Sequence, residues 1–323
     1  MFTDSHCHLT FPELASQWPD ISDAMKTAQV TRALCICTTL EEFPTVHEFA
    51  VAQPHIWATV GVHPDNEGVQ EPDLERLLQW GSLPKVMAIG ETGLDYYRLG
   101  SRSISDMEWQ RERFRVHIEA ARKLNKPLVI HTRSASDDTL AILKEAGECG
   151  DQSSAGGVFH CFTEDVDVAR QALDLGFYIS FSGIITFKSA QSIRDVAAMV
   201  PLDRLLIETD SPYLAPVPYR GKLNNPSYVP YVAQELAQVK NVTIEEIAEQ
   251  LRASGLSVTV RRNRGREAGA ACGQLAAERA GAPAPAAVAR RRELLVVASA
   301  AALKGERSPT PLAPSGPLGG VEQ

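Results

Sequence analysis

The chain alternates short apolar segments, rich in branched residues, with longer segments whose apolar positions recur at helical spacing. Eight apolar segments are expected to form strands, at 1–9, 33–39, 56–64, 86–95, 127–133, 156–162, 177–183 and 204–212. Amphipathic segments lie between them; in 107–125, for example, Phe114, Ile118 and Leu124 fall on one helix face. Eight strand–helix repeats in about 250 residues predict an α/β fold, a TIM-like (β/α)8 barrel.

Ionisable residues stand at the carboxyl ends of most of the expected strands. They are His6, His8, His63, Glu91, His131, His160 and Asp210. A barrel brings all its carboxyl strand ends into one ring, so these side chains would converge on a single mouth. The alternative architecture, a doubly wound open sheet, would spread them along a line. The clustering of ionisable residues at strand ends therefore favours the barrel.

The segment DSHCHL at 4–9 places two imidazoles on one strand face, because residues i and i+2 of a strand project to the same side. His6 and His8 are either a chelating pair or core histidines with hydrogen-bond partners. Four strand-end histidines combined with Glu91 and Asp210 form a nitrogen and oxygen donor set that suits Zn²⁺, Mn²⁺ or Mg²⁺. A bridging carboxylate would suit two such ions held close together.

Six motifs together resemble the TatD family of metal-dependent deoxyribonucleases, within the wider metallo-dependent hydrolase group. The motifs are DSHCHL, GVHP (61–64), GETGLDYY (90–97), PLVIHTR (127–133), FHCF (159–162) and ETDSPYLAP (208–216). The similarity runs from Met1 to about Gln250. It implies a TIM-like barrel with two divalent metal ions that cleaves phosphodiester bonds of DNA, at ends or in single strands, as a 3′→5′ exonuclease.

The resemblance also implies roles for individual residues. One metal would be held by His6, His8, Glu91 and Asp210, and the second by Glu91, His131 and His160, so that Glu91 bridges the two.

Three further roles concern the reaction itself. We expect Asp210 to orient the attacking water or accept its proton. His63 is expected to contact or protonate the scissile phosphate, the alternative being a structural histidine before Pro64. Arg133 is expected to pair with a phosphate oxygen, the alternative being a salt bridge at the rim.

Three tyrosines directly follow expected ligand positions and are candidates for stacking on a base. They are Tyr96, Tyr97 and Tyr213.

Composition and charge limit the kinds of partner and the cellular location that the sequence predicts. The net charge of −8 conceals an asymmetry, because residues 252–323 hold 11 Lys and Arg against 5 Glu, which leaves a net charge of −14 in residues 1–251. An acidic body argues against wrapping long nucleic acid on a basic surface, but not against a local phosphate site. No apolar run approaches 18 residues and the six cysteines form no C-x-x-C pair, which predicts a cytoplasmic protein with free thiols and no membrane association.

The composition changes near Leu251. The segment that follows is rich in Ala, Arg, Gly and Pro, and all 21 aromatic residues precede it. We therefore expect two parts, a hydrolase barrel at 1–252 and an atypical tail at 253–323 that is disordered. Such a composition is typical of a shifted reading frame in GC-rich sequence; the functional alternative is a basic nucleic-acid-binding arm.

Two other functions remain open at this point. The same metal barrel suits a small-molecule amide or ester hydrolase, although relatives of that kind often use a carbamylated lysine where Glu91 stands. The unusual C-terminus also leaves room for an inactive or non-catalytic product.

Overall fold

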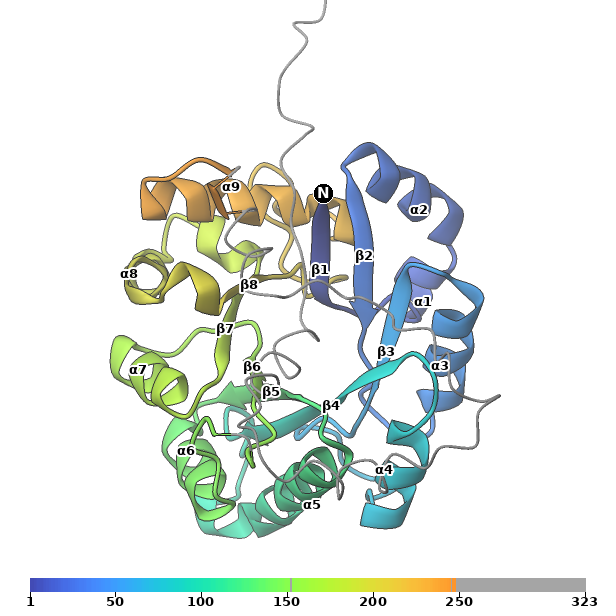
Figure 1. Cartoon of the computed structure of the whole chain (residues 1–323), viewed down its shortest axis with the longest axis vertical. Coiled ribbons are helices and arrows are strands. Elements are labelled where there is room, and N and C mark those ends of the chain that lie inside the picture. The colour runs from blue at the N-terminus through green and yellow to red at the C-terminus, as the bar shows by residue number, and fades with distance from the viewer. Residues whose placement is uncertain (152, 245, 248–323) are drawn as a thin grey trace, which may run out of the picture.

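A computed structural model describes residues 1–247 except 152 and 245. Eight parallel strands form one sheet in sequence order. They are β1 (Phe2–Cys7), β2 (Val30–Cys35), β3 (Ile56–Val60), β4 (Val86–Asp95), β5 (Leu128–Arg133), β6 (Gly157–Phe159), β7 (Tyr178–Phe181) and β8 (Leu205–Ile207). Figure 1 shows them around a central axis with the helices outside. Each strand overlaps a predicted one, although β2 begins earlier than expected because Val30 pairs with Phe2.

The first strand and the segment after the last one close the sheet on itself. The Asp210 amide donates to the His6 carbonyl at 2.9 Å, and the His8 amide donates to the Ser211 carbonyl at 2.8 Å. The Ser5 hydroxyl adds a bond to the Ile207 carbonyl at 3.0 Å. The sheet is therefore a TIM-like barrel, as predicted, and the open-sheet alternative was wrong.

Helices form the outer layer. They are α1 (Pro12–Ala15), α2 (Trp18–Thr27), α3 (Phe43–Ala52), α4 (Leu74–Gly81), α5 (Glu108–Leu124), α6 (Ser136–Glu145), α7 (Val166–Asp174), α8 (Gln191–Met199) and α9 (Val229–Lys240). The predicted amphipathic segment 107–125 forms α5, which buries Phe114 and Ile118 and ends where Asn125 adopts a left-handed conformation (φ 53°).

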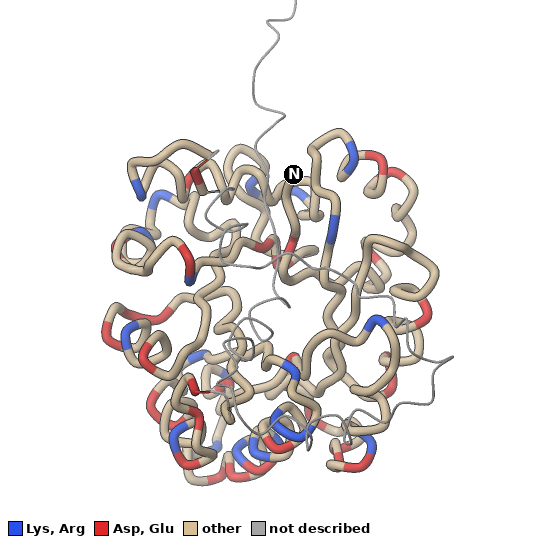
Figure 2. Tube along the Cα trace, viewed as in Figure 1, with Lys and Arg blue, Asp and Glu red and all other residues tan. Residues whose placement is uncertain are grey.

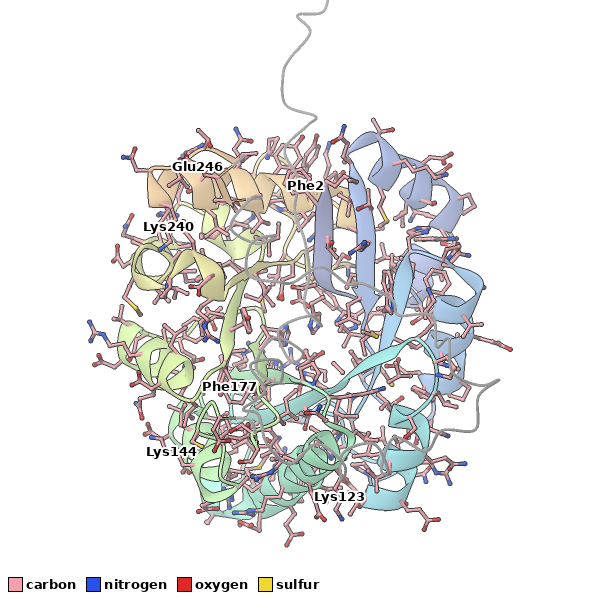
Figure 3. All side chains as sticks on the ribbon, viewed as in Figure 1. Phe2, Lys123, Lys144, Phe177, Lys240 and Glu246 are labelled. Atoms are coloured by element: carbon pink, nitrogen blue, oxygen red, sulfur yellow. The ribbon has the colours of Figure 1, made fainter. Side chains whose placement is uncertain are left out.

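The core occupies the barrel interior and the space between the strands and the helices. Strands such as β3 and β5 contribute Ile56, Val60, Leu128 and Ile130, all fully buried, as expected for parallel strands covered on both faces. Charged residues lie mainly along the outer helices (Figure 2). In Figure 3 the labelled Lys123 and Lys144 project outward from α5 and α6.

Three further expectations from the sequence concern the cysteines, membrane association and the C-terminal tail. The five cysteines within it are free, as expected. Among the helices at 1–247, none has both the length and the apolar character required to cross a bilayer. The expected tail at 253–323 lies outside the described residues.

Candidate metal centre

Seven ionisable side chains converge at the carboxyl ends of the strands. His6, Glu91 and His131 belong to β1, β4 and β5, and the others directly follow strands: His8, His63, His160 and Asp210. All seven are buried or half-buried. The fold thus brings together every residue that the sequence indicated as a metal ligand or catalytic group, at the end of the barrel where TIM-barrel active sites lie.

Four of these side chains form the first donor group. The Nε2 atom of His6 lies 3.3 Å from His8 Nε2, 3.3 Å from Glu91 Oε2 and 3.6 Å from Asp210 Oδ1. His8 Nε2 lies 3.6 Å from Asp210 Oδ1 and 4.0 Å from Glu91 Oε2. Ligands about 2.1 Å from a tetrahedral zinc ion are about 3.4 Å apart, so these donors are spaced as ligands of one cation would be.

The second donor group surrounds the other oxygen of Glu91. Glu91 Oε1 lies 2.8 Å from His160 Nε2, 3.5 Å from His131 Nδ1 and 3.4 Å from His63 Nε2. Glu91 therefore divides its two oxygens between the two donor groups, which is the geometry of a bridging carboxylate.

A buried carboxylate fixes the orientation of His131. Its Nε2 donates to Asp95 Oδ2 at 2.9 Å, which leaves the Nδ1 lone pair facing Glu91. Burial opposes protonation of His131, but Asp95 and Glu91 raise the pKa of this imidazole overall. Asp95 is not among the residues expected from the sequence. Its signal is the spacing, because Asp95 follows Glu91 by four residues in β4 and so shares its face.

Glu208 has the same relation to His160. Its Oε1 atom lies 3.4 Å from His160 Nδ1 and accepts the Cys161 amide at 2.7 Å, while Oε2 accepts the Ser180 hydroxyl at 2.5 Å. Glu208 is fully buried and directly follows β8. Sequence reasoning missed it too, although it stands two residues before Asp210 and directly follows the last strand.

The chemistry of these nitrogens indicates that the site binds cations. His160 directs Nδ1 to Glu208, and its Nε2 atom is buried and lies 2.8 Å from Glu91 Oε1. Burial opposes protonation of His160, but Glu91 and Glu208 raise its pKa well above the usual range, so without a metal a proton on Nε2 satisfies this contact. A bound cation would take the place of that proton. Burial opposes ionisation of Glu91, yet the surrounding histidines hold its pKa well below the usual range. A divalent ion would supply the required charge, so the residues present fit a metal.

His63 differs from the other histidines of the second group. The Asp65 amide donates to His63 Nδ1 at 3.1 Å, and burial lowers the pKa of His63 to about 3. The imidazole is thus neutral and its proton resides on Nε2, the atom that faces Glu91. His63 therefore offers a hydrogen-bond donor to the site, whereas His131 and His160 can offer lone pairs to a metal ion.

A cavity of about 710 Å³ opens above the donor groups. Arg133 lies at its edge, with Nη1 4.0 Å from Asp95 Oδ2 and its guanidinium 3.6 Å above the Tyr97 ring.

Tyr96 is buried and donates its hydroxyl proton to Asp138 Oδ2 at 2.7 Å, so it is not available to stack on a base. Tyr213 lines the cavity from the opposite side.

The fold and this site define a metal-dependent hydrolase barrel, and comparison with known proteins identifies the family. The model of the TatD related DNase family matches residues 3–255. The chain therefore belongs to this family, as its motifs predicted.

Two relatives and one solved structure show how far the likeness extends. The chain is 46% identical over 250 residues to the uncharacterized metal-dependent hydrolase YcfH of Escherichia coli K12, covering 76% of this chain and 91% of that protein. It is 32% identical over 241 residues to the 3′-5′ ssDNA/RNA exonuclease TatD of Escherichia fergusonii, covering 73% and 90%. The crystal structure of YjjV, a TatD homolog from E. coli K12, matches with a TM-score of 0.71 and 29% identity over 78% of this chain and 95% of that one.

Proposed function

We propose that this protein hydrolyses phosphodiester bonds of DNA, acting on ends or single strands as a 3′→5′ exonuclease with two divalent metal ions. The observation that carries the proposal is the division of the Glu91 oxygens between two donor groups in one mouth. The relative named as a 3′-5′ ssDNA/RNA exonuclease supports a nucleic-acid substrate.

Different residues of the chain carry out different parts of the proposed reaction. Bound metal ions would activate water and neutralise phosphate charge. Asp210, ionised because neighbouring imidazoles lower its pKa against the effect of burial, orients the attacking water and accepts its proton. His63 donates a hydrogen bond from Nε2 to a phosphate or leaving-group oxygen. Arg133, which faces the cavity, pairs with a phosphate oxygen.

A cleavage assay tests the proposal. Purified protein is incubated with single-stranded and double-stranded oligonucleotides, labelled at the 3′ or 5′ end, after exhaustive chelation and after return of Mg²⁺, Mn²⁺ or Zn²⁺. We expect no cleavage after chelation, recovery with metal, and stepwise loss of 3′ nucleotides. Full activity after chelation contradicts the two-metal site, and cleavage of small esters or amides without any cleavage of oligonucleotides favours the small-molecule alternative.

A further inference from the structure

Two aromatic side chains are exceptional in their exposure. All 21 aromatic residues of the chain lie in the described part, and 19 of them are buried or half-buried. Tyr97 is 61% exposed and Tyr213 is 57% exposed. Tyr213 lines the cavity above the donor groups, and Tyr97 adjoins the cavity through Arg133. The most water-exposed aromatic surface of the barrel is thus gathered at its mouth.

The two tyrosines follow strands on opposite sides of the barrel. Tyr97 follows β4 and Tyr213 follows β8. The strands run in order around a ring of eight, so β4 and β8 are four strands apart and face each other across the mouth (Figure 1). The donor residues lie at the same end of the barrel, because Glu91 belongs to β4 and Asp210 follows β8.

The backbone at each tyrosine is tied to the residues that build the site. The Tyr97 amide donates to Asp95 Oδ1 at 2.9 Å, and Asp95 also holds His131. Arg133 covers one face of the Tyr97 ring, which leaves the rest of the ring open to solvent.

The Tyr213 backbone is fixed in a comparable way. Its amide donates to the Asp210 carbonyl at 3.1 Å, and its carbonyl accepts the Asn224 side-chain amide at 2.6 Å. The backbone of both tyrosines is therefore held by residues of the site.

We propose that Tyr97 and Tyr213 stack on the two bases that flank the bond being cleaved, so that the substrate is an unpaired strand with no base preference at these two places. The inference rests on the proposed function and specifies its substrate. Stacking accepts every base because each has a π face. Residues 1–251 carry a net charge of −14, so a broad basic surface does not supply the affinity and local contacts must do so.

An experiment that removes either the ring or the base tests this pairing. Wild-type protein and the variants Tyr97→Ala and Tyr213→Ala are assayed on single-stranded oligonucleotides that carry an abasic site on one or the other side of the scissile bond. In the wild type, each missing base should raise KM about 5- to 150-fold, the range expected for one stacked base, with a smaller effect on kcat. Each alanine variant should lose its sensitivity to one of the two abasic sites and keep its sensitivity to the other.

Three controls separate stacking from other causes. Tyr97→Phe and Tyr213→Phe retain the ring and should keep the wild-type ratio of KM between normal and abasic substrates. Val51→Ala trims a 55% exposed side chain on the outer helix α3 and should change nothing. A 2-aminopurine placed at either flanking position should be quenched on binding by wild type and released from quenching in the matching alanine variant.

The two proposals fail in different ways. If wild type cleaves oligonucleotides but the alanine variants show the same ratio of KM between normal and abasic substrates as wild type, the stacking inference is wrong while the nuclease stands. If wild type cleaves no oligonucleotide with any of the metals, both are wrong.

Discussion

The orientations of His63, His131 and His160 are each set by one hydrogen-bond partner on the far side of the imidazole. Asp95 and Glu208 direct one nitrogen of His131 and His160 away from the site, so the other nitrogen can present a lone pair to a metal ion. The Asp65 amide does the opposite to His63, and a proton points inward there. One residue type thus provides both ligands and a donor within a few ångströms.

Replacing Asp95 tests whether this carboxylate supports His131 as a metal ligand. Asp95→Asn removes the charge that supports His131 as a ligand, so the affinity for the metal held by the second donor group should fall about 10- to 100-fold. The measurement is metal content by elemental analysis after dialysis against graded chelator. Asp23→Asn makes the same chemical change on the surface of α2 and serves as the control. Equal metal retention in both variants would show that Asp95 does not support a ligand.

A substitution at Asp210 distinguishes metal binding from proton transfer. Asp210→Asn keeps the shape of the side chain and one coordinating oxygen but cannot accept a proton. We expect most of the metal to remain bound while single-turnover cleavage slows by about a hundredfold or more. Cleavage at close to the wild-type rate with metal intact would show that a group other than Asp210 acts as the base.

At the scale of elements, helix α5 holds the loop that carries His63. Arg113 is buried and donates from Nη1 to the carbonyls of His63 at 2.8 Å and Asn66 at 2.9 Å, while pairing with Glu71. His117, one turn further along α5, accepts the Val62 amide at Nε2 at 3.0 Å. A helix on the outer layer therefore positions a donor in the mouth.

The His117 bond has a consequence for stability at acid pH. Burial lowers the pKa of His117 to about 4, against about 6.5 in an unfolded chain. Between these values the unfolded state binds a proton that the folded state does not, so stability falls as pH drops from about 6.5 to about 4.

His117→Gln should reduce this loss of stability, because the amide can still accept the Val62 bond but does not titrate. Relative to pH 7, the free energy of unfolding at pH 4.5 should decline less than in wild type, by on the order of 2 kcal/mol. Urea unfolding at both pH values measures it. An identical decline in the two proteins would mean that His117 does not contribute.

At the scale of the whole molecule, the barrel completes its own closure before the C-terminal segment begins. All eight strands are paired and the seam between β1 and the residues after β8 is hydrogen-bonded within residues 2–211. Helix α9 covers this side of the barrel and ends at Lys240.

We therefore expect that deleting residues 255–323 leaves the unfolding temperature unchanged or raises it, because all eight strands of the barrel and the residues of both donor groups lie within residues 1–247. Thermal unfolding followed by circular dichroism compares the full-length protein with the shortened protein. The oligonucleotide assay tests whether the shortened protein keeps its activity. A clear fall in the unfolding temperature would show that the deleted residues pack on the barrel.

The sequence by itself determined the strand order, the fold class and the identity of the residues that meet at the mouth. Its signal for these is local: apolar segments of strand length followed by amphipathic helices, and ionisable residues at strand ends. His6 and His8 share a face because the side-chain period of a strand is two. The same rule applied to Glu91 would also have found Asp95, which lies four residues further along β4.

Tertiary structure decided what each of these groups faces. The tautomer of His63 depends on the Asp65 amide in the following turn. The position of the His63 loop depends on Arg113, which comes from a helix some 50 residues later. Tyr97 is exposed, whereas its neighbour Tyr96 is buried. None of these follows from spacing, because each depends on contacts that form only when the barrel closes. Protonation and exposure are set by the surrounding atoms, and most of those atoms come from distant parts of the chain.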